Sequence, residues 1–243
     1  MREASVTSPD SDSPSGLEGG ATSPPVPVRV PRPRRKPRLR GVFHQIAAFA
    51  SVPAVAALVL RAKGGAATSA ALVYGVTLVS LFSISAVYHR MYWPLSIRRV
   101  IGRIDHAAIF LLIAGTYTPF CLLIGPGPGY RLLGAVWAGA LAGIVMVVWL
   151  TGTPKPIRAS LYVLLGWFIL PAVPAVRAGV GDAALVLLLV GGFFYTLGAA
   201  IYAARRPDPA PEIFGFHEIF HLLVIAAAIC HYLVVDAAVR ALS

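Results

Sequence analysis

The chain of 243 residues is 57% hydrophobic and only 13% charged, with a mean hydropathy of +0.75. Soluble domains are about 45–50% apolar and about a quarter charged, so this composition argues against a soluble protein. A formal net charge of +11 would suggest a nucleic-acid partner for a soluble chain. Here the basic residues lie between apolar runs, as they do in the loops of membrane proteins. We therefore expect no nucleic-acid partner.

Residues 1–40 form a basic tail that is rich in Pro and Ser. They hold eight of the 20 prolines and eight of the 21 Lys and Arg residues, but no aromatic residue. A segment with so little apolar surface cannot offset its ordering entropy, so we expect a disordered tail. It also lacks the apolar core of a signal peptide. A basic run beside the first apolar segment favours a cytoplasmic N-terminus, where it could contact anionic lipid headgroups.

Residues 41–243 form one membrane domain of apolar runs, each long enough to cross a bilayer. Charges, Gly and Pro separate the runs, as in the Gly125–Gly129 series of helix breakers. The seven expected spans are 44–62, 68–89, 104–125, 131–152, 160–177, 183–203 and 217–239. Continuous apolar runs argue against a β-barrel, and open sheets are excluded at membrane depth. The sequence therefore predicts an all-α integral membrane protein of the cell membrane, a bundle of seven transmembrane helices.

The charges of the loops predict the orientation of this bundle. With the N-terminus inside, the inner loops hold Arg90, Arg98, Arg99, Arg103, Lys155, Arg158, Arg205 and Arg206. The outer segments hold Arg61, Lys63, Arg131, Arg177 and Arg240. The positive-inside rule therefore predicts a cytoplasmic N-terminus and, after seven spans, a C-terminus outside.

Polar residues inside the expected spans are costly and therefore point to function. Ser85 and His89 end the second span, Asp105 lies at the start of the third, and His217 and His221 open the seventh. The end of an even span and the starts of two odd spans lie on the same side of the membrane. We therefore expect these side chains to share one depth near the cytoplasmic face.

The histidines of this group are spaced as metal ligands. His217 and His221 are four residues apart and so lie on one helical face. Zn²⁺ commonly takes three protein ligands and leaves a fourth position for water, and His89 is the expected third ligand. Ser85, one turn before His89, would supply a hydroxyl near the metal. Asp105 would orient the water or take its proton, as the base of a metal-assisted hydrolysis.

The run from His217 to His221 also matches the HExxH pattern of zinc proteases, in which the glutamate is the general base. In this alternative, Glu218 would be that base. Such a short pattern arises easily by chance, and no suitable third protease ligand follows it. His231 lies too far along the helix, about 15 Å beyond His221. An intramembrane protease is therefore the weaker alternative.

The other candidate residues have simpler interpretations. His44, at the start of the first span, is expected at the membrane interface. His106 is expected to be packed and hydrogen-bonded, with support of the metal ligands as the alternative. Cys121 and Cys230 fall inside expected spans and suit neither a disulfide framework nor a cysteine-rich metal site, so they are expected to be small core residues.

Three separated motifs resemble the signature of the hemolysin III family. These are Ser85-x-x-x-His89, the third span that Asp105 leads, and His217-x-x-x-His221. The family is the bacterial branch of the progestin and adipoQ receptors, which include the adiponectin receptors. The resemblance covers residues 41–240 and leaves out the tail. It implies a seven-helix bundle with zinc held by the three histidines, Asp105 beside the water and Ser85 nearby.

The resemblance leaves three classes of function open. The adiponectin receptors are linked to ceramide amide hydrolysis, whereas the bacterial members are described as haemolytic or pore-forming and linked to membrane-fluidity homeostasis. The first class is thus a zinc-dependent lipid amide hydrolase. The second is a pore-forming cytolysin, although no span carries a polar stripe. The third is a receptor-like sensor of membrane state in which zinc is structural. Membrane lipids are the expected partners, and the sequence leaves the substrate and the oligomeric state open.

Overall fold

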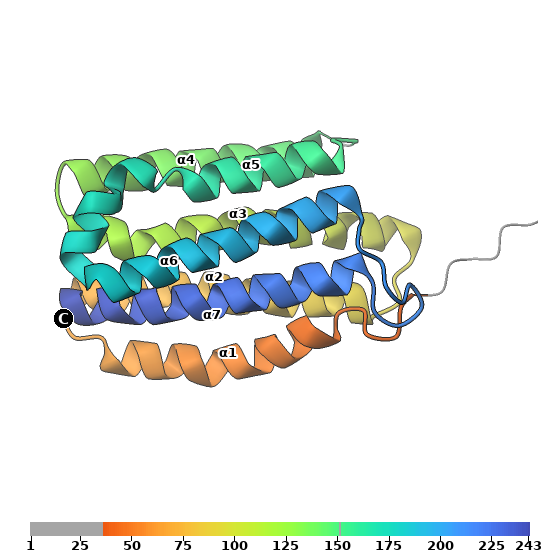
Figure 1. Ribbon diagram of the computed structural model, residues 1–243, viewed down its shortest axis with the longest axis horizontal. Helices are drawn as coiled ribbons and strands as arrows, with labels where there is room; N and C mark the ends of the chain where they lie inside the picture. The colour runs from red at the N-terminus through yellow and green to blue at the C-terminus, as the bar shows by residue number, and fades with distance from the viewer. Residues whose placement is uncertain (1–35, 151) are drawn as a thin grey trace, which may run out of the picture. The chain divides into compact units, whose positions relative to one another are not determined.

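The computed structural model describes residues 36–150 and 152–243, whose regular structure is helical (Figure 1). The helices are α1 (Val42–Arg61), α2 (Gly65–Arg90), α3 (Leu95–Ile124), α4 (Pro128–Trp149), α5 (Lys155–Trp167), the short 3₁₀ helix η1 (Leu170–Ala172), α6 (Val173–Ala204) and α7 (Phe216–Leu242). Apart from one isolated bridge between Ala210 and Phe214, these residues form no β-structure. The predicted all-α class is confirmed.

Six stretches of the described chain are long and apolar enough to cross a membrane. Helices α1, α2, α3, α4 and α7 each form one stretch, and the sixth is the 50-residue stretch Lys155–Ala204 that contains α5 and α6. This stretch is not one straight helix, because α5 ends at Trp167 and Gly181 interrupts α6 with a φ of 81°. The break at Gly181 falls between the expected spans 160–177 and 183–203, and inside the first of these a 3₁₀ turn with Pro171 follows α5. In Figure 1 the main part of α6 runs back alongside the bundle, opposite to α5.

Glycine and proline end the helices where the sequence suggested that they would. Gly125 follows α3 with a φ of 82°, and Gly127 precedes α4 with a φ of 83°. Side chains other than glycine rarely adopt this left-handed region, so the chain can reverse here between two long helices. Pro94 similarly stands immediately before α3, where its missing N–H costs no helical hydrogen bond.

Large apolar side chains cover the outside of the bundle. Leu60 of α1 is 85% exposed and Phe49 is 73% exposed, and exposed leucines, valines and phenylalanines continue over α4, α5 and α6. In water such a surface would be a large aggregation-prone patch, whereas hydrocarbon chains solvate it well. The chain is therefore an integral membrane protein, as the sequence predicted.

Small residues allow the inner helices to approach one another closely. A Cβ atom at Gly143 of α4 would overlap the ring of Phe110 on α3, and one at Gly115 of α3 would overlap Thr77 on α2. Association of helices in lipid depends on such close packing, because lipid chains are as apolar as the side chains themselves. Helices α2 and α3 are consequently the most buried of the membrane-spanning candidates.

The segment before α1 is attached to one end of the bundle. Residues 1–35 of the expected tail lie outside the described residues, and its last five residues, 36–40, are placed against the loop between α6 and α7. The backbone N–H of Arg38 donates to the carbonyl of Glu212 over 3.0 Å, and that of Leu39 to Ile213 over 3.2 Å. We refer to Lys36–Gly41 as the N-terminal segment.

Lys36 connects the N-terminal segment to the end of α2. Its Nζ donates to the carbonyl of Met91 over 2.7 Å and to that of His89 over 3.3 Å. Partial burial, followed by the positive charges of Arg98 and Arg40, lowers the pKa of Lys36. These two hydrogen bonds satisfy carbonyl groups at the C-terminal end of α2, which have no N–H partner within the helix.

Candidate metal centre and the cavity behind it

Three histidines converge at the end of the bundle where α2 ends and α7 begins. The last turn of α2 supplies His89, and the first two turns of α7 supply His217 and His221. The Nε2 atoms of His89 and His217 lie 3.1 Å apart, and one ring nitrogen from each of the three histidines lies within 4.8 Å of the others. The structure thus brings together the three histidines that the sequence predicted to be metal ligands.

This donor set fits a metal ion that accepts imidazole. Two nitrogens bound to tetrahedral zinc, at about 2.0–2.1 Å each, lie about 3.3 Å apart. The separation of 3.1 Å between His89 and His217 is close to that value. Within the described part of the chain, the buried Nδ1 atom of His221 has no hydrogen-bond partner. Zinc suits such a site, as do other first-row metals that bind histidine.

Asp105 and Ser85 lie beside the histidines, as their positions in the sequence suggested. The Oδ2 atom of Asp105, on α3, is 3.9 Å from Nε2 of His89. Ser85 lies one turn before His89 on α2, and its Oγ shares a hydrogen bond of 2.8 Å with Nδ1 of His44. A carboxylate and a hydroxyl therefore accompany the histidines at the same end of the bundle.

His44 belongs to this group, although sequence analysis placed it at the membrane interface. Its side chain is only 3% exposed, and its ring stacks on that of His221 with centroids 3.8 Å apart and planes 7° from parallel. The interfacial interpretation is wrong, because the start of α1 packs against α7 and not against lipid. Its level in the bundle was a usable signal, since the start of an odd span lies on the same side as His217 and His221.

Glu218 has partners other than the metal centre. The carboxylate is fully buried, its Oε1 lies 2.6 Å from Nε of Arg40, and its Oε2 accepts the backbone N–H of Gly215 over 2.9 Å. The second contact satisfies an N–H at the start of α7, as in a capping box. Glu218 therefore joins the N-terminal segment to α7, and this geometry argues against the protease alternative.

Among the described residues, the remaining candidates are not part of the cluster that the three histidines form. His106 has a buried Nδ1 with no hydrogen-bond partner in the described residues, and its ring lies 6.4 Å from that of Tyr202. The Nε2 atom of His231 is 3.1 Å from the carbonyl oxygen of Leu188, deep in the bundle. Cys121 and Cys230 are both free, with Cys121 buried.

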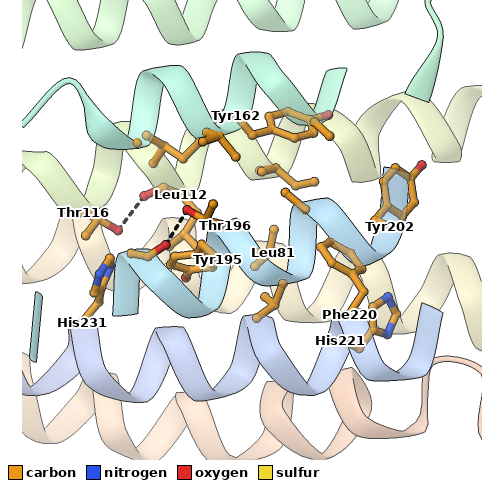
Figure 2. A pocket seen from close by; sticks show the side chains of 18 of the residues that line it. Leu81, Leu112, Thr116, Tyr162, Tyr195, Thr196, Tyr202, Phe220, His221 and His231 are labelled. Carbon is orange, nitrogen blue, oxygen red and sulfur yellow. Dashed lines mark hydrogen bonds between the residues drawn. The ribbon is translucent and has the colours of Figure 1, made fainter. Parts of the chain in front are cut away.

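A cavity of about 140 Å³ extends from the histidines into the bundle. Figure 2 shows Tyr202, Phe220 and His221 at one end, and Thr116 and His231 at the other. Leucine, isoleucine, valine and aromatic side chains from α3, α5, α6 and α7 form most of its wall. An apolar chain placed in this cavity would have its end beside the histidine cluster.

These features define a class: a multi-pass helical membrane protein with a candidate metal centre at one end of its bundle and an apolar cavity behind it. The family described as haemolysin-III related matches residues 33–232. The chain belongs to the hemolysin III family, within the wider group that includes the adiponectin receptors. The resemblance inferred from the three motifs is thereby confirmed.

Two bacterial relatives match most of the chain. Hemolysin-3 of Bacillus cereus is 32% identical over 191 residues, which cover 77% of this chain and 84% of that protein. The Hemolysin-3 homolog of Bacillus subtilis (strain 168) is 31% identical over 193 residues, covering 77% and 86%. The adiponectin receptor protein of Drosophila melanogaster is 32% identical over 154 residues, covering 55% of this chain and 34% of the receptor.

Proposed function

We propose that this protein is a zinc-dependent hydrolase that cleaves the amide bond of a membrane lipid. One observation carries the proposal: three convergent histidines and a carboxylate lie at the end of an apolar cavity inside a membrane bundle. A histidine cluster alone would suit many metal proteins. Its position at the end of a mostly apolar cavity inside a membrane bundle favours a lipid substrate.

The residues of the site have distinct roles in this hydrolysis. Zinc held by His89, His217 and His221 would polarise the amide carbonyl and lower the pKa of the attacking water. Asp105 takes a proton from the water at Oδ2 as the oxygen bonds to the carbonyl carbon. The same proton then passes to the amide nitrogen as the C–N bond breaks, which yields a carboxylic acid and an amine. The apolar wall of the cavity positions the acyl chain and limits the access of bulk water.

The proposal places the site on the cytoplasmic side of a seven-crossing bundle, with the N-terminus inside and the C-terminus outside. Its support is the stretch Lys155–Ala204, in which α5 alone, about 20 Å long, is too short to cross the bilayer. Residues 155–180 complete one crossing before the break at Gly181, and the rest of α6 supplies another. Residues 1–40 then form a separate cytoplasmic tail, and residues 41–243 the membrane domain.

Metal analysis of the purified protein tests the first part of the proposal. We expect about one zinc ion per chain in protein purified in detergent without chelators, and its loss in His217→Ala. His231→Ala is the matched control, because it removes a partly buried histidine outside the cluster and should keep the metal. A well-folded wild-type protein without zinc would refute the zinc mechanism.

Turnover of a lipid amide such as ceramide tests the second part. Asp105→Asn should retain zinc and lose hydrolysis by about 10²–10⁴-fold, because the amide cannot accept the proton. If the zinc-loaded wild-type protein hydrolyses no lipid amide, the metal is structural and the sensor interpretation replaces the hydrolase.

Lysis of membranes is the second candidate, because two relatives are named hemolysin-3 and hemolysin-3 homolog. The mostly apolar wall of the cavity gives it little support, since a conducting pore needs a polar path. Leakage of dye from liposomes that persists after replacement of all three ligand histidines would favour this candidate over the hydrolase.

A further inference from the structure

Two cations extend the cavity-lining face of α5 to the end of the bundle where the histidines lie. Ala159 and Tyr162 of α5 line the cavity. Lys155 lies one turn before Ala159, and Arg158 one turn before Tyr162. Residues four apart share a helical face, so both basic side chains continue the lining of the cavity toward the end where the histidines lie, which we call its mouth.

The ammonium group of Lys155 lies over aromatic residues at this mouth. Its Nζ is 4.9 Å from the ring centroid of Tyr202 and 5.8 Å from that of Phe216. Tyr202 lines the cavity, and its ring lies 5.9 Å from that of His217. The positive charge of Lys155 is therefore held beside the candidate metal centre and does not extend away from the bundle.

Three basic side chains near the mouth form no ion pair with any described acidic residue. Over the described ranges, 36–150 and 152–243, the ion pairs include none with Lys155, Arg158 or Arg205. Lys155 experiences the repulsion of Arg158 and Arg205, and also that of Arg40, whose charge is matched by Glu218.

Arg158 also has an unused hydrogen-bond donor. Its Nε is buried and has no hydrogen-bond partner within the described chain. A buried donor without a partner carries a desolvation cost that an anion at this position would remove.

We propose that the mouth of the cavity binds the phosphate group of an anionic lipid through Lys155 and Arg158, while an acyl chain of that lipid enters the cavity. The planar fork of arginine matches the geometry of phosphate oxygens, and the ammonium of lysine adds a second positive charge. This inference deepens the proposed lipid hydrolysis by naming the headgroup. Its test measures binding and not turnover, so a failure of either one is distinguishable from a failure of the other.

Binding of short-chain lipids to the full chain in neutral phosphatidylcholine nanodiscs tests the proposal. Dioctanoyl phosphatidic acid and dioctanoyl glycerol differ only by the phosphate, and their Kd values are compared by calorimetry. We expect the phosphatidic acid to bind about tenfold or more tightly, as befits charge-assisted hydrogen bonds. Lys155→Gln/Arg158→Gln should lose most of this preference. Equal affinity of the wild-type protein for the two lipids would overturn the proposal.

A matched pair of substitutions separates a specific site from general charge attraction. Arg98→Gln/Arg99→Gln removes two exposed cations from the start of α3, outside the lining of the cavity. This variant should keep the preference for phosphatidic acid. An equal loss in both double variants would show that the basic end of the bundle attracts anions without a specific site, and would overturn the proposal.

Two further arms complete the test. Inorganic phosphate should bind much more weakly than the lipid, and equal binding would assign the site to free phosphate and not to a lipid. If the double variant fails to fold, Arg158→Lys is tested in its place, because it keeps the positive charge and removes only the planar guanidinium group. It should weaken binding of phosphatidic acid severalfold, and unchanged binding would contradict a role for Arg158.

Discussion

At the scale of single residues, His44 determines how two groups of the candidate metal centre are held. Its ring covers one face of His221, and its Nδ1 shares a hydrogen bond with Oγ of Ser85. A ligand histidine needs a fixed ring plane if its nitrogen is to point at the metal, and neighbouring groups supply that constraint. We infer that His44 is a positioning residue for the proposed zinc site.

Substitution of His44 should weaken zinc binding without abolishing it. His44→Ala removes both contacts, and we expect the zinc affinity to fall by about 10–100-fold, as for other residues that support metal ligands. Competition with a chromophoric chelator measures this change. His44→Phe retains an aromatic ring against His221 and loses only the hydrogen bond, so its affinity should lie between those of His44→Ala and the wild type. Unchanged affinity in His44→Ala would contradict the positioning role.

The three predicted ligand histidines could be found from the sequence, whereas the role of His44 could not. His217 and His221 are four residues apart on one helix, so their convergence follows from helical geometry alone. His89 and Asp105 could be added because the parity of the spans fixes their level. The same parity places His44 at this level, but level alone does not show that its ring contacts His221, because that stacking depends on the packing of α1 against α7. That packing is a tertiary contact between distant segments of the chain.

At the scale of structural elements, the N-terminal segment holds the ends of α2 and α7 in register. Gly41 lies against α2, and its φ of 79° belongs to the left-handed region. A Cβ atom at Gly41 would lie 2.6 Å from Cβ of His89, which is closer than such atoms approach in proteins. The close passage of the backbone over His89 therefore requires glycine at this position.

Gly41→Ala should destabilise the protein and disturb the metal centre. Strain at a left-handed residue costs about 1 kcal/mol, and displacement of His89 should raise the total to roughly 1–3 kcal/mol. Gly64→Ala is a matched control, because Gly64 has a φ of 81° but no atom within 4 Å of its added Cβ. We expect both variants to have lower Tm values in detergent, but only Gly41→Ala to bind zinc less tightly. Equal zinc binding by the two would refute the contact with His89.

Replacing Arg40 should destabilise the protein more than replacing its partner Glu218. Glu218 is fully buried, whereas the side chain of Arg40 is 22% exposed. Arg40→Gln would leave a buried carboxylate unpaired, but after Glu218→Gln the arginine can turn toward solvent. We therefore expect Arg40→Gln to lower the Tm more, with a cost below the roughly 3–5 kcal/mol of a fully buried pair. Zinc content should persist in Glu218→Gln, and its loss would reopen a role for Glu218 at the metal.

At the scale of the whole molecule, the stretch Lys155–Ala204 determines on which side of the membrane the chain ends. Hydropathy reports how apolar these 50 residues are, but it does not report where the chain bends. The bends depend on Pro171, on Gly181 and on contacts of Tyr117, whose OH donates to the carbonyls of Leu165 and Gly166 near the end of α5. The helical class and the break near Gly181, between the expected spans 160–177 and 183–203, could therefore be predicted from sequence, but the end of α5 at Trp167 and the contacts of Tyr117 beside it could not.

Accessibility of introduced cysteines distinguishes one crossing of this stretch from two. The background chain carries Cys121→Ala and Cys230→Ala, and a membrane-impermeant maleimide is applied to intact and to permeabilised cells. Thr153→Cys probes the segment before α5, Glu212→Cys the loop before α7, and Ser243→Cys the C-terminus. Lys63→Cys, between α1 and α2, is the labelled control if the N-terminus is inside.

Two crossings and a cytoplasmic N-terminus predict that Thr153→Cys and Glu212→Cys react only after permeabilisation, whereas Ser243→Cys reacts in intact cells. A single crossing reverses the last two results, because it moves the loop before α7 outside and the C-terminus inside.

The contact between two histidines also limits the number of crossings. His89 ends α2 and His217 begins α7, so their contact places these two helix ends on the same side of the membrane. The chain between α2 and α7 must then cross the membrane an even number of times. Helices α3 and α4 supply two crossings, so we expect the stretch Lys155–Ala204 to cross twice.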